Sequence, residues 1–372
     1  MKRYLMNQIQ TDLTSKMVFL GGPRQVGKTT LAKSLLKDKG HLLGYLNWDV
    51  SSDREKILKK ELPPSSYWIF DELHKFKLWR NYLKGLFDEF KEEKQILVTG
   101  SARLDYYRYS GDSLQGRYHY LRLHPLSVSE LKLDRQKHFM DLLTLGGFPE
   151  PFLKGSAVQS KRWSREYRNR LFRDDITQVE QIQDVGSMEL LMIRLPELVG
   201  SPLSINSLRE DLQTSHKTLS RWIQILDRFY AIILVPPFGA PKIKAVKKEQ
   251  KHYHWDWTLV QDESLRFENL VACHLLKWVH YLEDTQGRDV ELRYFRDIDG
   301  REVDFVVTED RKPILFVECK WNDSEISKGL KYLNARFPLV PAWQISAIGK
   351  KDFVTFGKIR VCPAFVFLKD FV

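Results

Sequence analysis

The chain has 372 residues, 43% of them hydrophobic, a formal net charge of +11 and a sequence pI of about 9.3. That length suffices for two or three separate cores, and the basic balance makes nucleic acid a candidate partner, although a lysine-rich solvated surface gives the same number. The cysteines at 273, 319 and 362 have neither metal-ligand spacing nor the even count of a disulfide framework. With no apolar run near the length of a membrane span, we expect a soluble cytoplasmic protein.

The first region, residues 1–125, alternates short apolar strands with helix-length segments. The expected strands are residues 17–22, 44–49, 67–72, 95–101 and 118–123. Strands separated in this way favour an α/β fold, with a parallel sheet covered by helices on both faces.

The segment GPRQVGKT, residues 22–29, fits the phosphate-binding P-loop between a strand and a helix. Glycines let the backbone wrap phosphates, and the loop amides and the helix N-terminus face the negative charge. We expect Lys28 to reach the β- and γ-phosphates of ATP and Thr29 to bind Mg²⁺; the alternative is an ordinary glycine-rich turn. The predicted nucleotide-binding residues of this segment are Gly22, Pro23, Arg24, Gln25, Val26, Gly27, Lys28, Thr29 and Thr30.

The strand YWIFDE ends in two acids, at the strand end where α/β sheets place their sites. We expect Asp71 to hold Mg²⁺ and Glu72 to activate the attacking water. The alternative is an acid pair that favours a helix dipole.

Two further positions fit a nucleotide switch, and two arginines are candidates for an arginine finger. Thr99 and Ser101 end the strand expected beside the P-loop strand, where a hydroxyl would sense the γ-phosphate. Arg117 precedes the fifth strand and is the candidate arginine finger toward a neighbouring subunit, with Arg103 as its competitor. As surface side chains, either arginine would otherwise simply be solvated.

The second region, residues 126–255, is predicted to be mostly helical, a lid with a winged helix. Residues 204–229 show two helical stretches joined by a tight turn, and the apolar strand at 231–235 would begin a wing. Exposed Ser215, His216, Lys217, Ser220 and Arg221, together with the lysine-rich segment KIKAVKKEQK at 242–251, favour nucleic acid. Docking of a protein is the alternative.

The third region, residues 256–372, shows helix, three strands, helix and strand. Strict alternation along 301–307 places Val303, Phe305 and Val307 on one face and Asp304 on the other. Glu268 lies on an apolar helical stripe, and Glu318 and Lys320 end the apolar strand ILFVECK. Burying these groups unpaired is costly. A divalent metal held by Glu268, Asp304 and Glu318, with Lys320 acting on water or phosphate, resolves the conflict. The alternative is a buried salt-bridge cluster in an inactive domain.

Two resemblances follow from these motifs. VFLGGPRQVGKTTLA, YWIFDELHK, ILVTGSARLDYY, SLQGRYHYLRLHPLSVSEL and LGGFPE resemble a family of bacterial and archaeal AAA+-like ATPases with a C-terminal domain related to restriction endonucleases. The helical Glu, the strand Asp and the Glu-x-Lys pair resemble the PD-(D/E)XK nucleases, with Cys319 in the x position. The P-loop motifs predict ATP hydrolysis with Mg²⁺, and the basic charge with the candidate winged helix predicts nucleic acid, DNA being favoured. An arginine finger that acts on a neighbouring subunit predicts a homo-oligomer, a hexameric ring being favoured. We expect nucleotide state to be coupled to a metal-dependent nuclease-like domain; the alternative is a nucleotide-switched signalling or scaffold ATPase.

Overall fold

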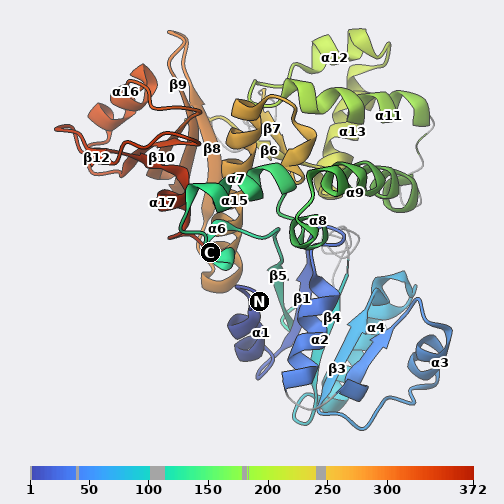
Figure 1. The fold of residues 1–372 in the computed structure, drawn as a ribbon. Helices are drawn as coiled ribbons and strands as arrows, with labels where there is room; N and C mark the ends of the chain where they lie inside the picture. Colours follow the sequence, from blue (N-terminus) through green and yellow to red (C-terminus); the bar gives the residue numbers. More distant parts are fainter. Residues whose placement is uncertain (1, 39–41, 101–113, 178–181, 183, 240–248) are drawn as a thin grey trace. The chain divides into compact units, whose positions relative to one another are not determined.

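A computed structural model describes residues 2–38, 42–100, 114–177, 182, 184–239 and 249–372. The chain forms two compact units (Figure 1). Unit 1 comprises Met1–His124 with Asp284–Gln286, and unit 2 comprises Pro125–Glu283 with Gly287–Val372. The three-domain boundaries expected from the sequence stay a prediction.

Unit 1 contains a five-stranded parallel sheet in the order β2-β3-β4-β1-β5. The strands are β1 (Met17–Gly21), β2 (Tyr45–Asn47), β3 (Tyr67–Asp71), β4 (Gln95–Thr99) and β5 (Tyr118–Arg122). All five lie within the ranges expected from the apolar runs. Because β4 pairs with β1, the strand that ends in Thr99 adjoins the P-loop strand, as the sequence predicted.

Helices surround this sheet (Figure 1). They are α1 (Met6–Asp12), α2 (Lys28–Asp38), α3 (Ser51–Lys59) and α4 (Trp79–Phe90), with 3-10 turns at Leu42–Gly44 and Leu73–Lys75. α4 packs Trp79, Leu83 and Leu86 into a core with β-strand residues such as Phe19 and Phe70. This apolar core fixes the strand ends, where the polar side chains lie.

Unit 2 begins with a helical region. Its helices are α6 (Val128–Leu131), α7 (Gln136–Leu145), α8 (Pro149–Lys154), α9 (Ala157–Arg170) with a π-helical continuation at Leu171–Ile176, α11 (Val185–Arg194) followed by a 3-10 turn at Leu195–Leu198, α12 (Ile205–Asp211) and α13 (His216–Arg228). Ser204 and Ser215 cap α12 and α13 with their side chains. The predicted helix-turn-helix is therefore present as a pair of adjacent helices.

A two-stranded antiparallel sheet follows α13. It consists of β6 (Ile232–Val235) and β7 (Lys251–His254), and every residue of β7 is buried. Two helices arranged as a helix-turn-helix and then a hairpin match the expected order of a winged helix. That assignment stays a prediction, since a wing is normally presented to solvent and this hairpin packs inside the unit.

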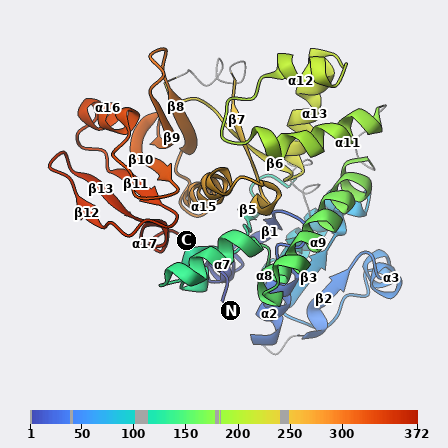
Figure 2. The ribbon, with the colours of Figure 1, turned by 45° about the horizontal axis from the view of Figure 1, so that its top comes forward.

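The C-terminal part of unit 2 is a six-stranded sheet in the order β12-β13-β11-β10-β9-β8. Its strands are β8 (Val290–Arg296), β9 (Glu302–Glu309), β10 (Lys312–Lys320), β11 (Ala342–Ser346), β12 (Phe353–Val354) and β13 (Ile359–Pro363), and its helices are α15 (Glu263–Gln286), α16 (Lys328–Arg336) and α17 (Ala364–Leu368), with a 3-10 turn at Trp257–Leu259. Figure 2 shows α15 between this sheet and the hairpin of β6 and β7. The helix and first strands follow the predicted order, while β12, β13 and α17 were not expected.

The strict alternation predicted for β9 is wrong. The register between β8 and β9 shifts by one residue between the pairs Arg293–Val306 and Phe295–Val303. As a result Val303 packs in the same cluster as Val306, together with Phe316. An extra residue in one strand re-aims its neighbours, and here the irregularity lies between Val303 and Val306, the stretch that contains Asp304.

Candidate functional site

The loop between β1 and α2 has the backbone that close contact with phosphate requires. Gly22 has φ +130° and Gly27 has φ +101°, values that L side chains rarely adopt. A Cβ on Gly22 would lie 2.3 Å from the backbone oxygen of Leu123. Glycine at this position is therefore a steric requirement of the loop.

Lys28 begins α2 and its side chain turns back over the loop. Its Nζ donates to the carbonyl oxygens of Gly22 and Pro23 at 2.9 and 2.7 Å, and the residue is buried. Pro23 and Val26 are also buried, whereas Thr30 is exposed. The loop thus holds an ammonium group at the N-terminus of a helix, a position suited to an anion.

Arg3 supports the loop from the N-terminal segment. Its guanidinium donates to the carbonyl oxygen of Val26, at 2.8 Å, and to that of His124. Tyr4 donates to the carbonyl oxygen of Arg122. Sequence reasoning missed both residues, because nothing in a local pattern connects the first residues of the chain with a loop more than twenty positions away.

Asp71 is the centre of a polar network at the carboxyl ends of the strands. Thr29 and Tyr45 both donate to its Oδ2 at 2.7 Å, and Thr99 donates to its Oδ1. The strand register brings these groups together, since Asp71 pairs with Asn47 on β2 and with Thr99 on β4. Burial raises the pKa of Tyr45, and the hydrogen bond to Asp71 raises it further, so the phenol stays a donor. Tyr45 was missed, although it lies on a predicted strand.

Glu72 follows Asp71 in a left-handed conformation with φ +58°. Its carboxylate lies 3.4 Å from Lys75 and 3.6 Å from His74, and its backbone N–H donates to the oxygen of Thr99. Burial raises the pKa of Glu72, and the charge of Lys75 opposes that rise. A non-glycine residue in this region is uncommon and is often found at functional sites.

Arg117, the candidate arginine finger, forms a two-pronged ion pair with Asp88 of α4, at 2.8 and 3.1 Å. It precedes β5, the edge strand, at the end where Met17 pairs with Tyr118. The loop that follows β1 lies at the opposite end of the strands, so Arg117 is remote from the loop of its own chain. Ser101 and Arg103 lie outside the described residues.

These residues fit a bound ATP and Mg²⁺. The loop leaves no room for a side chain at Gly22, Lys28 supplies a cation, and a hydroxyl and a carboxylate meet where Thr29 contacts Asp71. Hard oxygen ligands of this kind suit Mg²⁺.

In unit 2 the candidate metal ligands lie near one another, but their nearest cations are lysines. Lys251 Nζ lies 2.6 Å from Glu302, 3.3 Å from Glu268 and 3.7 Å from Asp304. Lys251 was expected among the exposed, polyanion-binding lysines of 242–251. That placement is wrong, because the residue is 1% exposed on β7 and its charge is satisfied by carboxylates. Burial opposes its charge, yet these acids raise its pKa.

Glu318 has a separate partner. Lys320 Nζ donates to Glu318 Oε1 at 2.8 Å, and Asp304 Oδ2 accepts from the backbone N–H of Cys319. Burial, followed by the charge of Asp304, raises the pKa of Glu318. Within the part of the chain that the structure describes, no three His, Cys, Asp or Glu residues are grouped so as to hold a metal ion. The predicted three-carboxylate metal site stays a prediction, and the ion pairs are its alternative.

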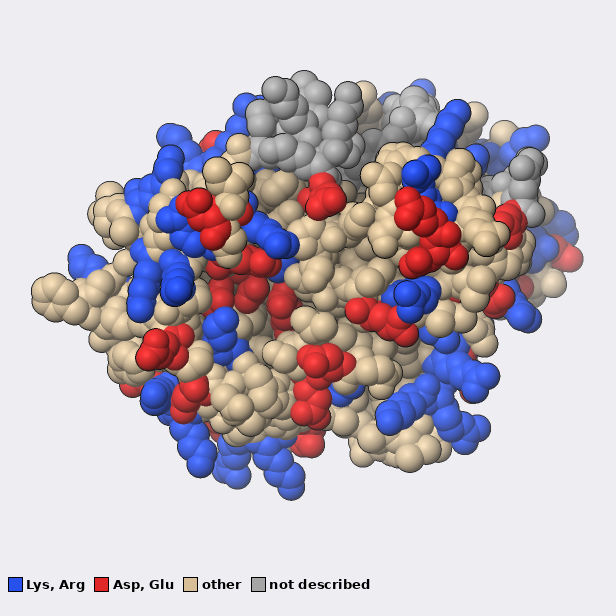
Figure 3. All heavy atoms as spheres, turned by 90° about the horizontal axis from the view of Figure 1, so that it is seen from above, with Lys and Arg blue, Asp and Glu red and all other residues tan. Residues whose placement is uncertain are grey.

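Basic side chains of unit 2 lie on several elements. His216 and Lys217 are exposed at the start of α13, as are Lys161 and Arg165 on α9. Ser215 uses its side chain to cap α13. On the face seen in Figure 3, lysines and arginines stand in several groups with acids between them. Lys247 and Lys248 lie outside the described residues.

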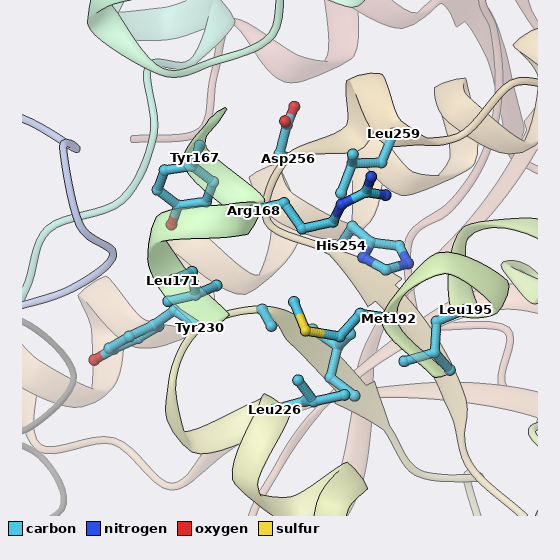
Figure 4. A pocket seen from close by; sticks show the side chains of 12 residues that line it. Tyr167, Arg168, Leu171, Met192, Leu195, Leu226, Tyr230, His254, Asp256 and Leu259 are labelled. Carbon is cyan, nitrogen blue, oxygen red and sulfur yellow. The ribbon is translucent and has the colours of Figure 1, made fainter. Parts of the chain in front are cut away.

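Figure 4 shows a small pocket, partly open to solvent, among α9, α11, α13 and β7. Its lining is mostly apolar, with His254 and Asp256 as buried polar groups. Burial lowers the pKa of His254 to about 3, and Asp256 already accepts hydrogen bonds from Ser164 and Thr258. The pocket separates packed elements and carries none of the predicted site residues.

The geometry of unit 1 agrees with comparisons to known proteins. Residues 14–132 match the family described as an AAA domain. Unit 1 carries an AAA-type ATPase domain. Residues 136–266 and 265–363 match two families described as domains of unknown function, DUF8612 and DUF4143. None of the described helices is long and apolar enough to cross a membrane.

The proteins to which the chain is similar include two curated proteins and one solved structure. The uncharacterized protein Rv2008c of Mycobacterium tuberculosis is 24% identical, over 90% of this chain and 82% of its own length. The uncharacterized protein MJ1544 of Methanocaldococcus jannaschii is 22% identical, over 71% of this chain and 63% of its own length. Thermotoga maritima RuvB aligns with 62% of this chain and 89% of its own chain, at 18% identity and a TM-score of 0.31.

Proposed function

We propose that the AAA domain binds ATP with Mg²⁺ and hydrolyses it, and that this cycle acts as a switch on nucleic acid. The observation that carries the proposal is the convergence of Thr29, Thr99 and Asp71 beside the loop that Lys28 crosses. With Tyr45, which also donates to Asp71, three strands and a helix contribute to this network, which is more than a chance glycine-rich turn requires.

Each side chain has a role that follows from its position. Lys28 and the loop amides hold the phosphates, and Thr29 with Asp71 holds the metal ion. Bound Mg²⁺ supplies charge neutralisation for phosphoryl transfer. Glu72 orients and deprotonates the attacking water. Burial raises the pKa of its carboxyl group, which makes the carboxylate a better base. Thr99 senses the γ-phosphate through Asp71, with Ser101 as a second hydroxyl.

The proposed assembly is a homo-oligomer, with a hexameric ring favoured, because Arg117 lies at the strand ends remote from its own loop. An arginine there acts only on the nucleotide of a neighbouring subunit. For that role it must leave Asp88, its partner within the chain.

Nucleic acid, with DNA favoured, is proposed as the partner of unit 2. Support comes from the net charge of +11 and from the paired helices α12 and α13, with exposed His216 and Lys217. Phosphate contacts release counterions, so binding is expected to weaken steeply with salt.

The sequence also predicted a second function, in which the ATPase is coupled to metal-dependent cleavage of nucleic acid. The pairing of Glu318 with Lys320 and of Glu302 with Lys251 favours the alternative, in which the C-terminal sheet is a scaffold. We therefore propose an ATPase switch without a nuclease step.

The test is ATP hydrolysis measured without nucleic acid and with duplex DNA, single-stranded DNA or RNA at two salt concentrations. We expect Mg²⁺-dependent hydrolysis that one of these polyanions changes at low salt only. Lys217→Glu on α13 should reduce that response, whereas Lys369→Glu, an exposed lysine beyond α17, should not. If no polyanion changes the rate of hydrolysis, the ATPase activity would stand, but nucleic acid would be rejected as the partner.

A further inference from the structure

We propose that Lys251 is the resident cation of the carboxylate cluster formed by Glu268, Glu302 and Asp304, and that it occupies the place of a divalent metal there. This goes beyond the proposed function and does not depend on ATP hydrolysis. It assigns to one lysine the neutralising role that the nuclease resemblance gives to Mg²⁺.

The contacts of Lys251 are those of a bound cation. One ammonium group faces an oxygen of each carboxylate, at 2.6 Å from Glu302, 3.3 Å from Glu268 and 3.7 Å from Asp304. The residue is 1% exposed, so the protein, and not water, supplies its partners. Its Nζ also lies 5.5 Å from the ring centre of Tyr294, a favourable position for a cation.

Two further hydrogen bonds to the cluster come from β7 and from β10. Tyr253, two residues after Lys251 on β7, donates to Glu268 Oε1 at 2.7 Å. The backbone N–H of Cys319 donates to Asp304 Oδ2 at 2.8 Å. One oxygen of each carboxylate, Glu268 Oε1 and Asp304 Oδ2, therefore already accepts a hydrogen bond.

Lys251 is held in place by its backbone. β7 pairs with β6 through Val235 and Lys251, and Pro202 forms a bridge to Lys251. The N–H of Leu203 donates to the oxygen of the preceding residue, Gln250. The backbone at Lys251 is thus fixed, and burial and ion pairs hold its side chain among the carboxylates.

A dication that shared oxygens of Glu268 and Asp304 would lie within a few ångströms of the ammonium. Metal–oxygen distances are about 2.0–2.6 Å, so a metal on the oxygens that face Lys251 would lie close to its ammonium group. In a buried site their repulsion is only weakly screened. The lysine and the metal are thus alternatives for one position.

Glu318 does not offer a second metal position of comparable quality. Its Oε2 is buried without a hydrogen-bond partner in the described structure, but Lys320 holds the other oxygen of that carboxylate at 2.8 Å. Glu268 and Glu302 thus share Lys251, and Glu318 has Lys320 as its own partner. Asp304 contacts Lys251 and the backbone beside Glu318.

The experiment is titration of Mn²⁺ and Mg²⁺ into the full chain, followed by calorimetry and thermal melts. Asp71→Asn serves as the background throughout, so that metal at the nucleotide site does not contribute. With Lys251 present we expect no metal-induced shift in melting temperature and no stoichiometric binding. Metal binding or metal-induced stabilisation in this protein would overturn the proposal.

Lys251→Met keeps the volume of the side chain and removes its charge. It should lower the melting temperature of unit 2 in EDTA by roughly 10 °C, because buried acids lose their cation, and Mn²⁺ should restore much of it. Lys312→Met, an exposed lysine at the start of β10, should change neither. A Lys251→Met protein with the melting temperature of its parent, and with no change on addition of Mn²⁺, would contradict the proposal.

If Lys251→Met fails to fold, the double change Lys251→Met with Glu268→Gln removes one charge of each sign. We expect it to recover stability relative to the single change and to bind no metal, because a carboxylate ligand is missing. Stoichiometric Mn²⁺ binding by the double variant would count against the proposed ligand set.

Discussion

Asp71 on β3 and Thr99 on β4 are paired in register, and Thr99 Oγ1 donates to Asp71 Oδ1 at 2.5 Å. The other oxygen of that carboxylate accepts from Thr29 at the start of α2. One acid thus connects the phosphate-binding helix to two neighbouring strands, which is how a change of bound phosphate would reach the sheet.

Asp71→Asn is expected to lower Mg²⁺-dependent ATP hydrolysis roughly 100-fold, because the amide is a poor ligand for the ion and its water. Tyr45→Phe removes one of the donors but keeps the carboxylate, and should retain most of the rate. The measurement is the rate as a function of Mg²⁺ concentration. An Asp71→Asn protein with the wild-type dependence would remove Asp71 from the metal site.

Gly22→Ala and Gly85→Ala form a matched pair in unit 1. The first places a Cβ 2.3 Å from a backbone oxygen at φ +130°, and should destabilise the unit by roughly 2 kcal/mol or more. Gly85 lies in α4, and a Cβ added there would have no other atom within 4 Å. Gly85→Ala should therefore stabilise unit 1 by about 0.5–1 kcal/mol. Urea unfolding compares them; equal effects would mean that the loop tolerates a side chain.

Arg117→Ala and Asp88→Ala break the same ion pair. If the pair were only structural, both changes would act alike. The in-trans role predicts that Arg117→Ala lowers the ATPase rate by orders of magnitude in the assembled protein, while Asp88→Ala leaves it within a few-fold. Mixing Arg117→Ala with Lys28→Ala subunits should recover activity. A fully active monomer would rule out this role.

Because His274 is buried and neutral, we expect unit 2 to lose stability in acid. Its Nε2 accepts from the N–H of Val128 at 3.1 Å and its Nδ1 donates to the oxygen of Leu270 at 2.8 Å, which requires the neutral ring. Burial lowers the pKa of His274 to about 4, so the unfolded chain gains a proton below about 6.5 and the folded chain does not. The stabilisation is therefore present above pH 6.5 and is lost as the pH falls toward 4.

Between pH 7 and pH 5 this one residue should account for about 2 kcal/mol of the loss in the free energy of unfolding. His274→Gln keeps a donor and an acceptor without the charge, and should flatten the profile by that amount. Chemical denaturation at the two pH values measures it. Identical pH profiles for both proteins would mean that His274 is protonated in the fold at little cost.

The strands of unit 1 could be predicted, and its candidate site residues named, because both depend on local patterns. Apolar runs mark the strands, and Lys28 and Asp71 each stand at a strand end or helix start that the pattern itself defines. Tyr45 and Arg3 were missed because their roles depend on register and on contacts between distant segments.

The position of Lys251 could not be predicted from the sequence. This residue ends a lysine-rich segment, and composition alone favours solvent for such a residue. Its burial depends on the pairing of β7 with β6 and on acids that lie 17 or more positions further along the chain. The irregular register around Asp304 was likewise invisible, since alternation assumes a regular strand.

Glu72→Gln is the sharpest test of whether this chain hydrolyses ATP with Glu72 as the base. The change keeps the shape and removes the charge, so Mg²⁺-dependent ATP binding should match the wild type while steady-state hydrolysis falls by at least roughly 100-fold. Lys28→Ala serves as the comparison that loses binding itself. A purified Glu72→Gln protein that hydrolyses ATP at the wild-type rate, or a wild type that hydrolyses none with Mg²⁺ in any assembly state, would contradict the account.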